Sequence, residues 1–314
     1  MNNVESKIGK SFLIVFILLL MISISSCTSY DEQRSILPDR RDSGIINVSC
    51  DESFKPIIDE MVKVYESRWR KTKINVIYKP EADCLNDIEN DSIRMVITTR
   101  KLNESEQNHL IDSFKVNPDS RVLAVDAIAV IVHPDNPDSL FTMEELKQIL
   151  TGKFKRNLIP VFDGIKATST VRFIVDSVLR KDSLTKNAVA ARTSEGVIDY
   201  IAQQKDAIGF IGVSWIGNRD DSLHLSFLKK VKIAQLESLY TKGIFIKPVQ
   251  GNIYLQRYPM LRDLVYILKE KHQGLGKGFA NFMTDNIGQL IFHRAYLVPA
   301  WKDFYIRPIV ISRE

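Results

Sequence analysis

Residues 122–132 read Val-Leu-Ala-Val-Asp-Ala-Ile-Ala-Val-Ile-Val, and residues 133–137 continue with His-Pro-Asp-Asn-Pro. The apolar run is rich in β-branched residues and is about twice as long as an ordinary strand. The prolines and polar residues that follow it are typical of a turn. A strand of this length can leave one sheet and enter another. The stretch therefore predicts a chain built as two parts that share one long strand.

Short β runs and helical patterns alternate on both sides of this long run. We expect strands at residues 45–49, 74–78, 94–98, 158–162, 207–213 and 231–236. We expect helices at residues 56–68, 104–114, 171–179, 197–203 and 278–295, and one more that a capping box at Thr142 opens and Gly152 ends. Strands separated by helices of these lengths predict βαβ units with parallel pairing. The fold class is therefore α/β.

The N-terminus carries an apolar segment outside this pattern. Lys7 and Lys10 precede eleven apolar residues at 12–22, and Ile24-Ser25-Ser26-Cys27 follows. Eleven residues rise about 16 Å as a helix, short of the roughly 30 Å of a bilayer core. A basic start, a short apolar core and small residues predict a secretory signal peptide. The end of the segment resembles the bacterial lipobox, which implies cleavage after residue 26 and lipidation of Cys27.

The lipobox resemblance implies that the mature chain is anchored to a membrane. Residues 1–26 would be removed as a lipoprotein signal peptide, and Cys27 would carry acyl chains such as palmitate. The polar residues 27–43 would form a tether. The alternative is an ordinary signal peptide with an incidental cysteine. No second apolar run of this kind follows, so we expect an exported body that faces the periplasm or the cell exterior.

Export changes the interpretation of the two other cysteines, because it places Cys50 and Cys84 in an oxidising compartment. Each is expected at the C-terminal end of a strand in the first two βα units. Neighbouring strands lie about 4.8 Å apart, so such ends can approach within the roughly 4.4–6.8 Å of Cα separation that a disulfide requires. A Cys50–Cys84 bridge and two free buried thiols both remain open.

The composition excludes several classes of protein. The 314 residues carry a formal charge of +5 and 45% apolar residues, which is typical of a globular chain with two domains. The positive charge forms no block of the kind that nucleic-acid binding requires. The five histidines lack metal-ligand spacing, and neither a nucleophile–base pair nor a Gly-x-Ser-x-Gly motif occurs. We therefore expect no metal, no cofactor and no enzyme activity.

Several short motifs occur in a fixed order, at residues 126–137 with 141–152, at 207–212 (Ala-Ile-Gly-Phe-Ile-Gly), at 258–262 (Tyr-Pro-Met-Leu-Arg), and at 278–289 with 298–299. Together they resemble the phosphate-binding proteins of bacterial phosphate ABC importers (PstS-like), a type II periplasmic binding protein family. The resemblance covers roughly residues 45–300. It implies two lobes, each a mainly parallel sheet flanked by helices, joined by two crossovers around a ligand cleft. Lobe one would comprise residues 44–126 plus 258–314, and lobe two residues 127–257.

We expect the ligand where strands end and helices begin, because free N–H groups at a helix start suit an anion. The resemblance implies that Ser53, in the loop after the first strand, contacts the ligand, although Ser53 could instead only cap the next helix. Asp51 and Glu52 depart from the family's glycine/serine/threonine loop. A carboxylate beside an anion is unfavourable unless it accepts a proton. Asp51 could therefore support monohydrogen phosphate over sulfate, or it could face solvent.

Two further segments complete the expected site. Thr98, Thr99 and Arg100 end the third strand, where the family has a hydroxyl pair. Arg100 could hold an oxyanion with two hydrogen bonds, or it could be a solvated loop charge. The Asp that some members place here to read the ligand's proton is absent.

The other segment is Thr168-Ser169-Thr170, which matches the family's Ser-Gly-Thr at a helix start. The alternative for these three residues is a run of caps and loop hydroxyls. Arg172 follows in the first helical turn, from which it could reach the cleft or a neighbouring carboxylate.

These features predict a lipid-anchored extracytoplasmic solute-binding protein. As a monomer, it would capture a small oxyanion, most of all phosphate, for the permease subunits of an ABC importer, with no chemistry on the ligand. The alternative is a sensor or scaffold lipoprotein whose cleft serves a protein partner. Asp51, Glu52 and the missing cleft Asp suggest that alternative.

Overall fold

The fold is seen in a computed structural model, which describes residues 39–164, 168–218 and 222–302. The predicted signal peptide at 1–26 and the lipidation site Cys27 lie outside the described residues, as does most of the tether at 27–43. Contacts divide the chain into residues 1–39 and 40–314, and the second part holds all the named strands and helices.

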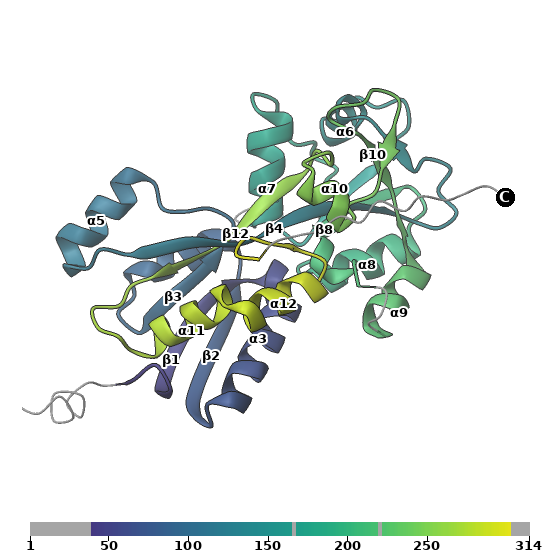
Figure 1. Cartoon of the computed structure of the whole chain (residues 1–314). Helices are drawn as coiled ribbons and strands as arrows, with labels where there is room; N and C mark the ends of the chain where they lie inside the picture. The colour runs from purple at the N-terminus through teal and green to yellow at the C-terminus, as the bar shows by residue number, and fades with distance from the viewer. Residues whose placement is uncertain (1–38, 165–167, 219–221, 303–314) are drawn as a thin grey trace, which may run out of the picture. The chain divides into compact units, whose positions relative to one another are not determined.

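A mixed sheet is the frame of this second part (Figure 1). Its main path runs in the order β2 (Lys71–Lys79), β1 (Ser43–Asp51), β3 (Ile93–Thr98), β12 (Leu261–Leu268), β4 (Asp119–Val132), β8 (Ala207–Gly212), β6 (Ile159–Phe162) and β7 (Val189–Ala190). Two short strands also pair with β4, namely β9 (Lys232–Ile233) and β13 (Val298–Pro299). A smaller sheet holds β11 (Phe245–Ile246), β10 (Gln235–Glu237) and β5 (Leu140–Phe141).

Strand β4 joins two parts of the main sheet, as the long apolar run predicts. Its first part pairs with β12 as far as Ala127, and its second part pairs with β8 from Ile128 onward. We call β2, β1, β3, β12, β13 and the first part of β4 half-sheet A. The second part of β4 forms half-sheet B with β8, β6, β7 and β9. The change of partner falls beside the predicted lobe boundary, while the lobe bounds themselves stay a prediction.

The pairing directions follow from the connections. The parallel pairs of the main sheet, β1–β2, β1–β3, β6–β7 and β6–β8, come from strands with a helix between them. The antiparallel pairs in the described sheet all involve β4 or β12. Of these two long strands, β4 passes from half-sheet A into half-sheet B, whereas β12 lies within half-sheet A and pairs with the first part of β4.

Helices cover the sheet and bury its apolar residues. They are α3 (Lys55–Arg68), α4 (Glu81–Asn86), α5 (Glu104–Phe114), α6 (Met143–Leu150), α7 (Ser169–Phe173), α8 (Ser194–Gln203), α9 (Ser222–Lys230), α10 (Gln250–Tyr254), α11 (Leu275–Thr284) and α12 (Asn286–Arg294). A π-helical turn, Ile174–Leu179, continues α7. Short 3₁₀ turns stand at Glu52–Phe54 (η1), Asp87–Glu89 (η2) and Val213–Trp215 (η4). The capping box predicted at Thr142 is confirmed at the start of α6.

Two expected elements are interrupted. The helix expected at 278–295 is two helices, because Asp285 takes an extended conformation and its carboxylate accepts the N–H groups of Ile287 and Gly288. A capping side chain inside an apolar pattern ends one helix and starts the next. The run at 231–236 is also divided, since β9 pairs with β4 while β10 belongs to the smaller sheet.

The two cysteines differ from expectation in one respect. Cys50 lies in β1 as predicted, but Cys84 lies in α4 rather than at the end of a strand, because the chain turns into a helix directly after Pro80. Both thiols are free and buried in this structure. Burial raises the pKa of Cys84 to about 12, and burial, with smaller contributions from nearby acidic groups, raises that of Cys50.

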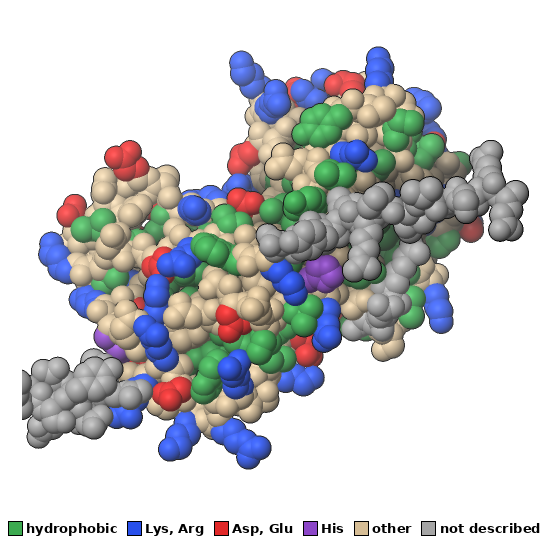
Figure 2. Space-filling view, viewed as in Figure 1, with side chains coloured by type: hydrophobic (Ala, Val, Ile, Leu, Met, Phe, Trp, Pro, Cys, Tyr) green, Lys and Arg blue, Asp and Glu red, His purple; other side chains and the backbone are tan. Residues whose placement is uncertain are grey.

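The distribution of surface charge concerns contacts with nucleic acid, and the length and hydropathy of the helices concern contacts with a membrane. On the face drawn in Figure 2, lysines and arginines are scattered among acidic and apolar side chains and do not gather into one patch. Among the described residues, none of the helices combines the length and the hydropathy that crossing a bilayer demands.

Candidate functional site

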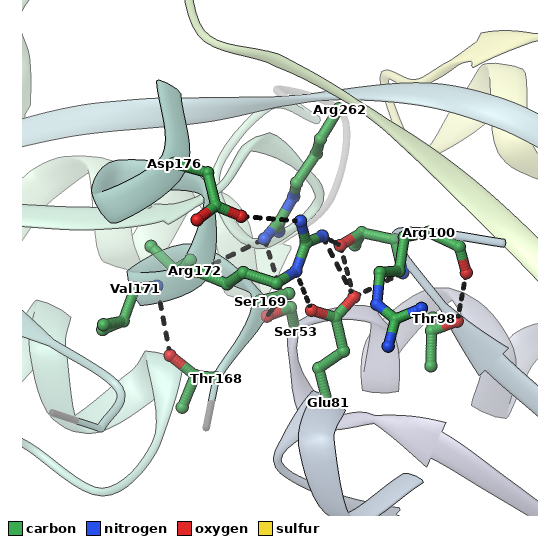
Figure 3. Close-up of polar contacts among 12 residues, drawn as sticks. Ser53, Glu81, Thr98, Arg100, Thr168, Ser169, Val171, Arg172, Asp176 and Arg262 are labelled. Atoms are coloured by element: carbon green, nitrogen blue, oxygen red, sulfur yellow. Dashed lines mark hydrogen bonds and ion pairs between the residues drawn. The ribbon is translucent and has the colours of Figure 1, made fainter. Parts of the chain in front are cut away.

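A buried guanidinium lies where the two half-sheets meet. Arg262 in β12 stands opposite Asp126 in β4, and its Nε donates to Asp126 Oδ2 at 2.8 Å. The two side chains are 2% and 0% exposed. Arg262 Nη1 also donates to Ser169 Oγ at 2.8 Å and to Thr170 Oγ1 at 3.3 Å. Arg262, in half-sheet A, thus contacts the start of α7, the helix that follows strand β6 of half-sheet B (Figure 3).

Gly212 provides the space for this guanidinium. A Cβ atom at Gly212 would lie 3.1 Å from Arg262 Nη2 and 3.3 Å from Asp126 Oδ2. These separations are tighter than ordinary contacts, so a larger residue would displace the ion pair. The glycine in the motif at 207–212 therefore has a steric reason.

Two more carboxyl groups share this buried region. Asp51 caps η1, since its Oδ1 accepts the N–H of Ser53 at 3.0 Å. Asp163 follows β6, and both residues are buried. Among the described residues, four buried side-chain atoms lack a hydrogen-bond partner, and all four belong to this group: Asp51 Oδ2, Asp126 Oδ1, Asp163 Oδ1 and Arg262 Nη2. We call Asp51, Asp126, Asp163 and Arg262 the buried charge cluster.

Burial controls the protonation of this cluster. Burial raises the pKa of Asp51 and of Asp126, and Arg262 only partly opposes it. Burial and the negative charge of Asp51 raise the pKa of Asp163 to about 7. For Arg262, burial alone would lower the pKa, but the charges of Asp126, Asp51 and Asp163 raise it, so the guanidinium stays charged. The cluster thus holds one fixed cation and carboxyl groups that retain protons easily.

A second group of charges has all its main contacts satisfied. Glu81, at the start of α4, accepts the N–H of Thr99 at 2.8 Å and its hydroxyl at 2.5 Å. Arg172 in α7 donates from Nε to Glu81 Oε2 at 2.5 Å and from Nη2 to Thr99 Oγ1 at 2.7 Å. Figure 3 shows Arg172 between Glu81 and the more exposed Asp176. We call Glu81, Thr99 and Arg172 the carboxylate triangle.

The triangle has the opposite electrostatics to the cluster. Burial by itself would raise the pKa of Glu81, but the hydrogen bond and charge of Arg172 and the donors of Thr99 hold it below its ordinary value. The two groups are neighbours, because the charge of Glu81 acts on the pKa of Asp51. Glu81 therefore remains an anion beside carboxyl groups that do not readily ionise.

Further contacts join η1 to the turn and helices that follow the strands of half-sheet B. The Ser53 carbonyl accepts from Trp215 Nε1 at 2.8 Å and from Ser214 Oγ at 3.2 Å. Glu52 Oε2 accepts from the Ser194 hydroxyl at 3.0 Å. The hydroxyls of Ser53 and Ser169 lie 3.4 Å apart. The structure therefore has the two parts in direct contact at the expected ligand site.

A pocket opens beside the triangle. It has a volume of about 670 Å³, and its wall includes Glu81, Arg172, Arg100, Leu102 and Val175. Apolar and charged side chains both line it. Glu81 and Arg172 thus line this pocket, and the charge of Glu81 also acts on Asp51 of the buried charge cluster.

The structure brings most of the predicted site residues together. Asp51, Ser53, Ser169 and Thr170 surround Arg262, while Thr99 and Arg172 hold Glu81. The other three make local contacts. Thr168 caps α7, Thr98 donates to the Arg100 carbonyl, and Arg100 forms two hydrogen bonds with Glu106 at 2.8 and 2.7 Å.

Four residues of this region are not among the site residues expected from the sequence. Asp126 and Arg262 stand in apolar strands, and a charge inside such a run signals a buried pair that needs a partner. Asp163 directly follows a strand, which is a common position for a site residue. Glu81 gives no such signal, since an acidic residue in a first helical turn is ordinary.

Comparisons with known proteins place this geometry in a family. The profile of the PBP superfamily domain matches residues 37–286. The chain belongs to the PBP superfamily. The α/β fold of a periplasmic binding protein, expected from the resemblance, is confirmed by solved structures of that kind, and its sheet is mixed and curled.

Individual relatives agree with this assignment. The "Phosphate-binding protein PstS" of Borreliella burgdorferi is 22% identical and covers 88% of this chain and 94% of its own length. A structure from Clostridium perfringens, described as a phosphate ABC transporter substrate-binding protein with bound phosphate, is similar with a TM-score of 0.69, 18% identity, and coverage of 82% of this chain and 100% of that chain. An ABC-type phosphate transport receptor from Vibrio cholerae gives a TM-score of 0.61 at 17% identity, with coverage of 81% and 99%.

Proposed function

We propose that this PBP superfamily protein binds phosphate between the two half-sheets and delivers it to the permease of an ABC importer. The relatives named above support a solute-binding role for phosphate. Binding and release would require the two predicted lobes, at 44–126 plus 258–314 and at 127–257, to open and close as a hinge. The protein would act on the ligand by capture alone.

The observation that carries this proposal is the mixture of unpartnered atoms in the buried charge cluster. Arg262 Nη2 is a donor without an acceptor, while Asp51 Oδ2 and Asp163 Oδ1 are carboxyl oxygens without a partner. Protonated phosphate offers both functions, since its oxygens accept hydrogen bonds and its P–OH group donates one. Sulfate has no proton to donate, so these carboxyl oxygens would keep no donor, and any of them that is ionised would face an anion.

Each predicted site residue then has a role. Ser53, Ser169 and Thr170 would donate their hydroxyl protons to phosphate oxygens beside Arg262. Asp51, together with Asp163, would accept the ligand's proton. Thr99 and Arg172 would contribute further donors, while Thr98, Arg100 and Thr168 would support the loops that present the others.

The cellular setting is part of the same proposal. Cleavage after residue 26 and acylation of Cys27 would place a monomer outside the cytoplasm, on a tether at 27–43. Metabolic labelling with radioactive palmitate checks this anchor. Label should enter the protein and be lost in Cys27→Ser, and label retained by Cys27→Ser would contradict the anchor.

Calorimetry on the mature, tag-free protein tests the ligand. We expect phosphate to bind and sulfate to bind at least about 100-fold more weakly, because one buried unpaired charge costs several kcal/mol. Ser169→Ala should weaken phosphate binding about tenfold or more, the usual effect of losing a hydrogen bond to a charged group. Ser226→Ala, at an exposed position of α9, is the matched control and should leave the affinity unchanged. Absence of phosphate binding by a folded protein would overturn the proposal.

The alternative is a sensor or scaffold lipoprotein whose cleft serves a protein partner. It is favoured by the contacts of Glu52 in η1 with α8 and of Glu81 in α4 with α7. These contacts give both carboxylates hydrogen-bond donors from the chain itself. A folded protein that binds no oxyanion in the calorimeter would support this alternative. A histidine kinase gene beside this one would do the same, whereas a permease gene would favour transport.

A further inference from the structure

The Glu81 carboxylate is held in the way that proteins hold a bound oxyanion. It accepts a backbone N–H and a hydroxyl from Thr99, and it accepts from both Nε and Nη2 of Arg172. A guanidinium that contacts two oxygens binds carboxylate and phosphate with the same geometry. The Glu81 side chain is only 2% exposed. The triangle is therefore an occupied anion site whose anion belongs to the chain.

The donors that hold Glu81 are the ones expected to serve a ligand. Thr99 directly follows β3, and Arg172 lies in the short helix that Ser169 begins. Glu81 reaches them because β2 ends at Lys79 and α4 begins at Glu81, directly after Pro80, at the same edge of half-sheet A. A free anion at this edge and the Glu81 carboxylate cannot both use Arg172 Nε and the Thr99 N–H.

Residues of the triangle also connect the pocket to the buried charge cluster. Glu81 and Arg172 are part of the pocket wall. Arg172 follows Ser169 and Thr170, which contact Arg262. Arg172 is 34% exposed, so it can turn to solvent when its partner leaves. An anion that enters from the pocket would first meet the Glu81–Arg172 ion pair.

We infer that Glu81 is a tethered competitor for the oxyanion, a specificity-determining carboxylate that an incoming ligand must displace from Thr99 and Arg172. This inference rests on the proposed function. It sets a minimum strength for the ligand: an anion that interacts with Thr99 and Arg172 no more strongly than the Glu81 carboxylate does not displace it. It also explains how two parts of the chain remain in contact at this site through their own side chains.

The test is phosphate titration of Glu81→Gln in the calorimeter, with wild type alongside. The amide fills the same volume but lacks the charge that holds Arg172, so phosphate affinity should rise about tenfold. Glu81→Ala, which removes the acceptor altogether, should show a rise at least as large. Asp176→Asn is the matched control, because it removes the other carboxylate of Arg172, which is 59% exposed, and leaves Glu81 in place. Its affinity should equal that of wild type.

The outcomes separate the inference from the proposed function. Wild-type binding with unchanged or weaker binding in both Glu81 variants overturns the competitor and leaves the function standing. Binding by the Glu81 variants alone supports the competitor and contradicts phosphate capture by the native chain. If none of the folded proteins binds phosphate, both fall. Melting curves by circular dichroism establish that each variant is folded before titration.

Discussion

The buried charge cluster and the carboxylate triangle are neighbours that treat a buried acid in opposite ways. In the triangle, the acceptors of Glu81 meet a guanidinium and the Thr99 donors, and its pKa lies below the ordinary value. In the cluster, Asp51, Asp126 and Asp163 share one arginine and retain unpartnered atoms, and their pKa values are raised. A satisfied anion stabilises the fold as it stands, whereas an unsatisfied set requires a proton or a ligand.

The largest effect should come from the one cation of the cluster. Arg262→Met leaves Asp126 buried without its ion-pair partner, and breaking such a pair costs about 3–5 kcal/mol of unfolding free energy. Urea denaturation at pH 7 measures this loss. The same experiment on Arg262→Met with Asp126→Leu should recover most of it, because both charges are then gone. A double variant as unstable as the single one would mean that the pair is not the source of the effect.

The next effect concerns pH and Asp163. Its pKa is about 7 in the folded chain against the ordinary 3.8, so the unfolded chain releases this proton first as pH rises. The group therefore lowers stability progressively between about pH 4 and pH 7, and the native state is penalised above pH 7. Asp163→Asn should be more stable than wild type at pH 8, by about 1–3 kcal/mol, and nearly equal to it at pH 4.

Urea denaturation across this pH range checks the Asp163 prediction. Asp112→Asn, on the exposed side of α5, is the control and should follow the wild-type curve. A stability difference between Asp163→Asn and wild type that does not change with pH would show that the carboxyl group is not the titrating element.

The frame of both regions could be predicted from the sequence, because it depends on local patterns. The apolar run of β4, the helix at Glu104–Phe114 and the Thr142 capping box follow from residue type and spacing alone. The hydroxyls at Ser53, Thr99 and Ser169 follow from the ends of strands and the starts of helices. These are the parts of the site that secondary structure positions directly.

The partners of those hydroxyls could not be predicted in the same way. Glu81 meets Arg172 across 91 residues, and Arg262 meets Ser169 across 93. Such pairs depend on how the two half-sheets meet, which residue spacing does not reveal. The break at Asp285 was missed for a different reason: a capping aspartate can stand inside an amphipathic pattern without changing its apolar period.

The smallest effect should distinguish two glutamates, Glu52 and Glu81, which contact helices that follow strands of half-sheet B. Glu52 accepts a hydrogen bond from the Ser194 hydroxyl, and burial raises its pKa, whereas the hydrogen bond and charge of Arg172 lower the pKa of Glu81. A lowered pKa contributes stability above the unfolded value of 4.5, and this contribution is lost as pH falls through the folded pKa. At pH 7, Glu81→Gln should therefore lose about 1 kcal/mol, and Glu52→Gln should stay within about 0.5 kcal/mol of wild type. The two variants should converge on wild type in urea denaturation once the pH falls below the folded pKa of Glu81. Equal losses at pH 7 would mean that the charge of Arg172 is not what distinguishes the two carboxylates.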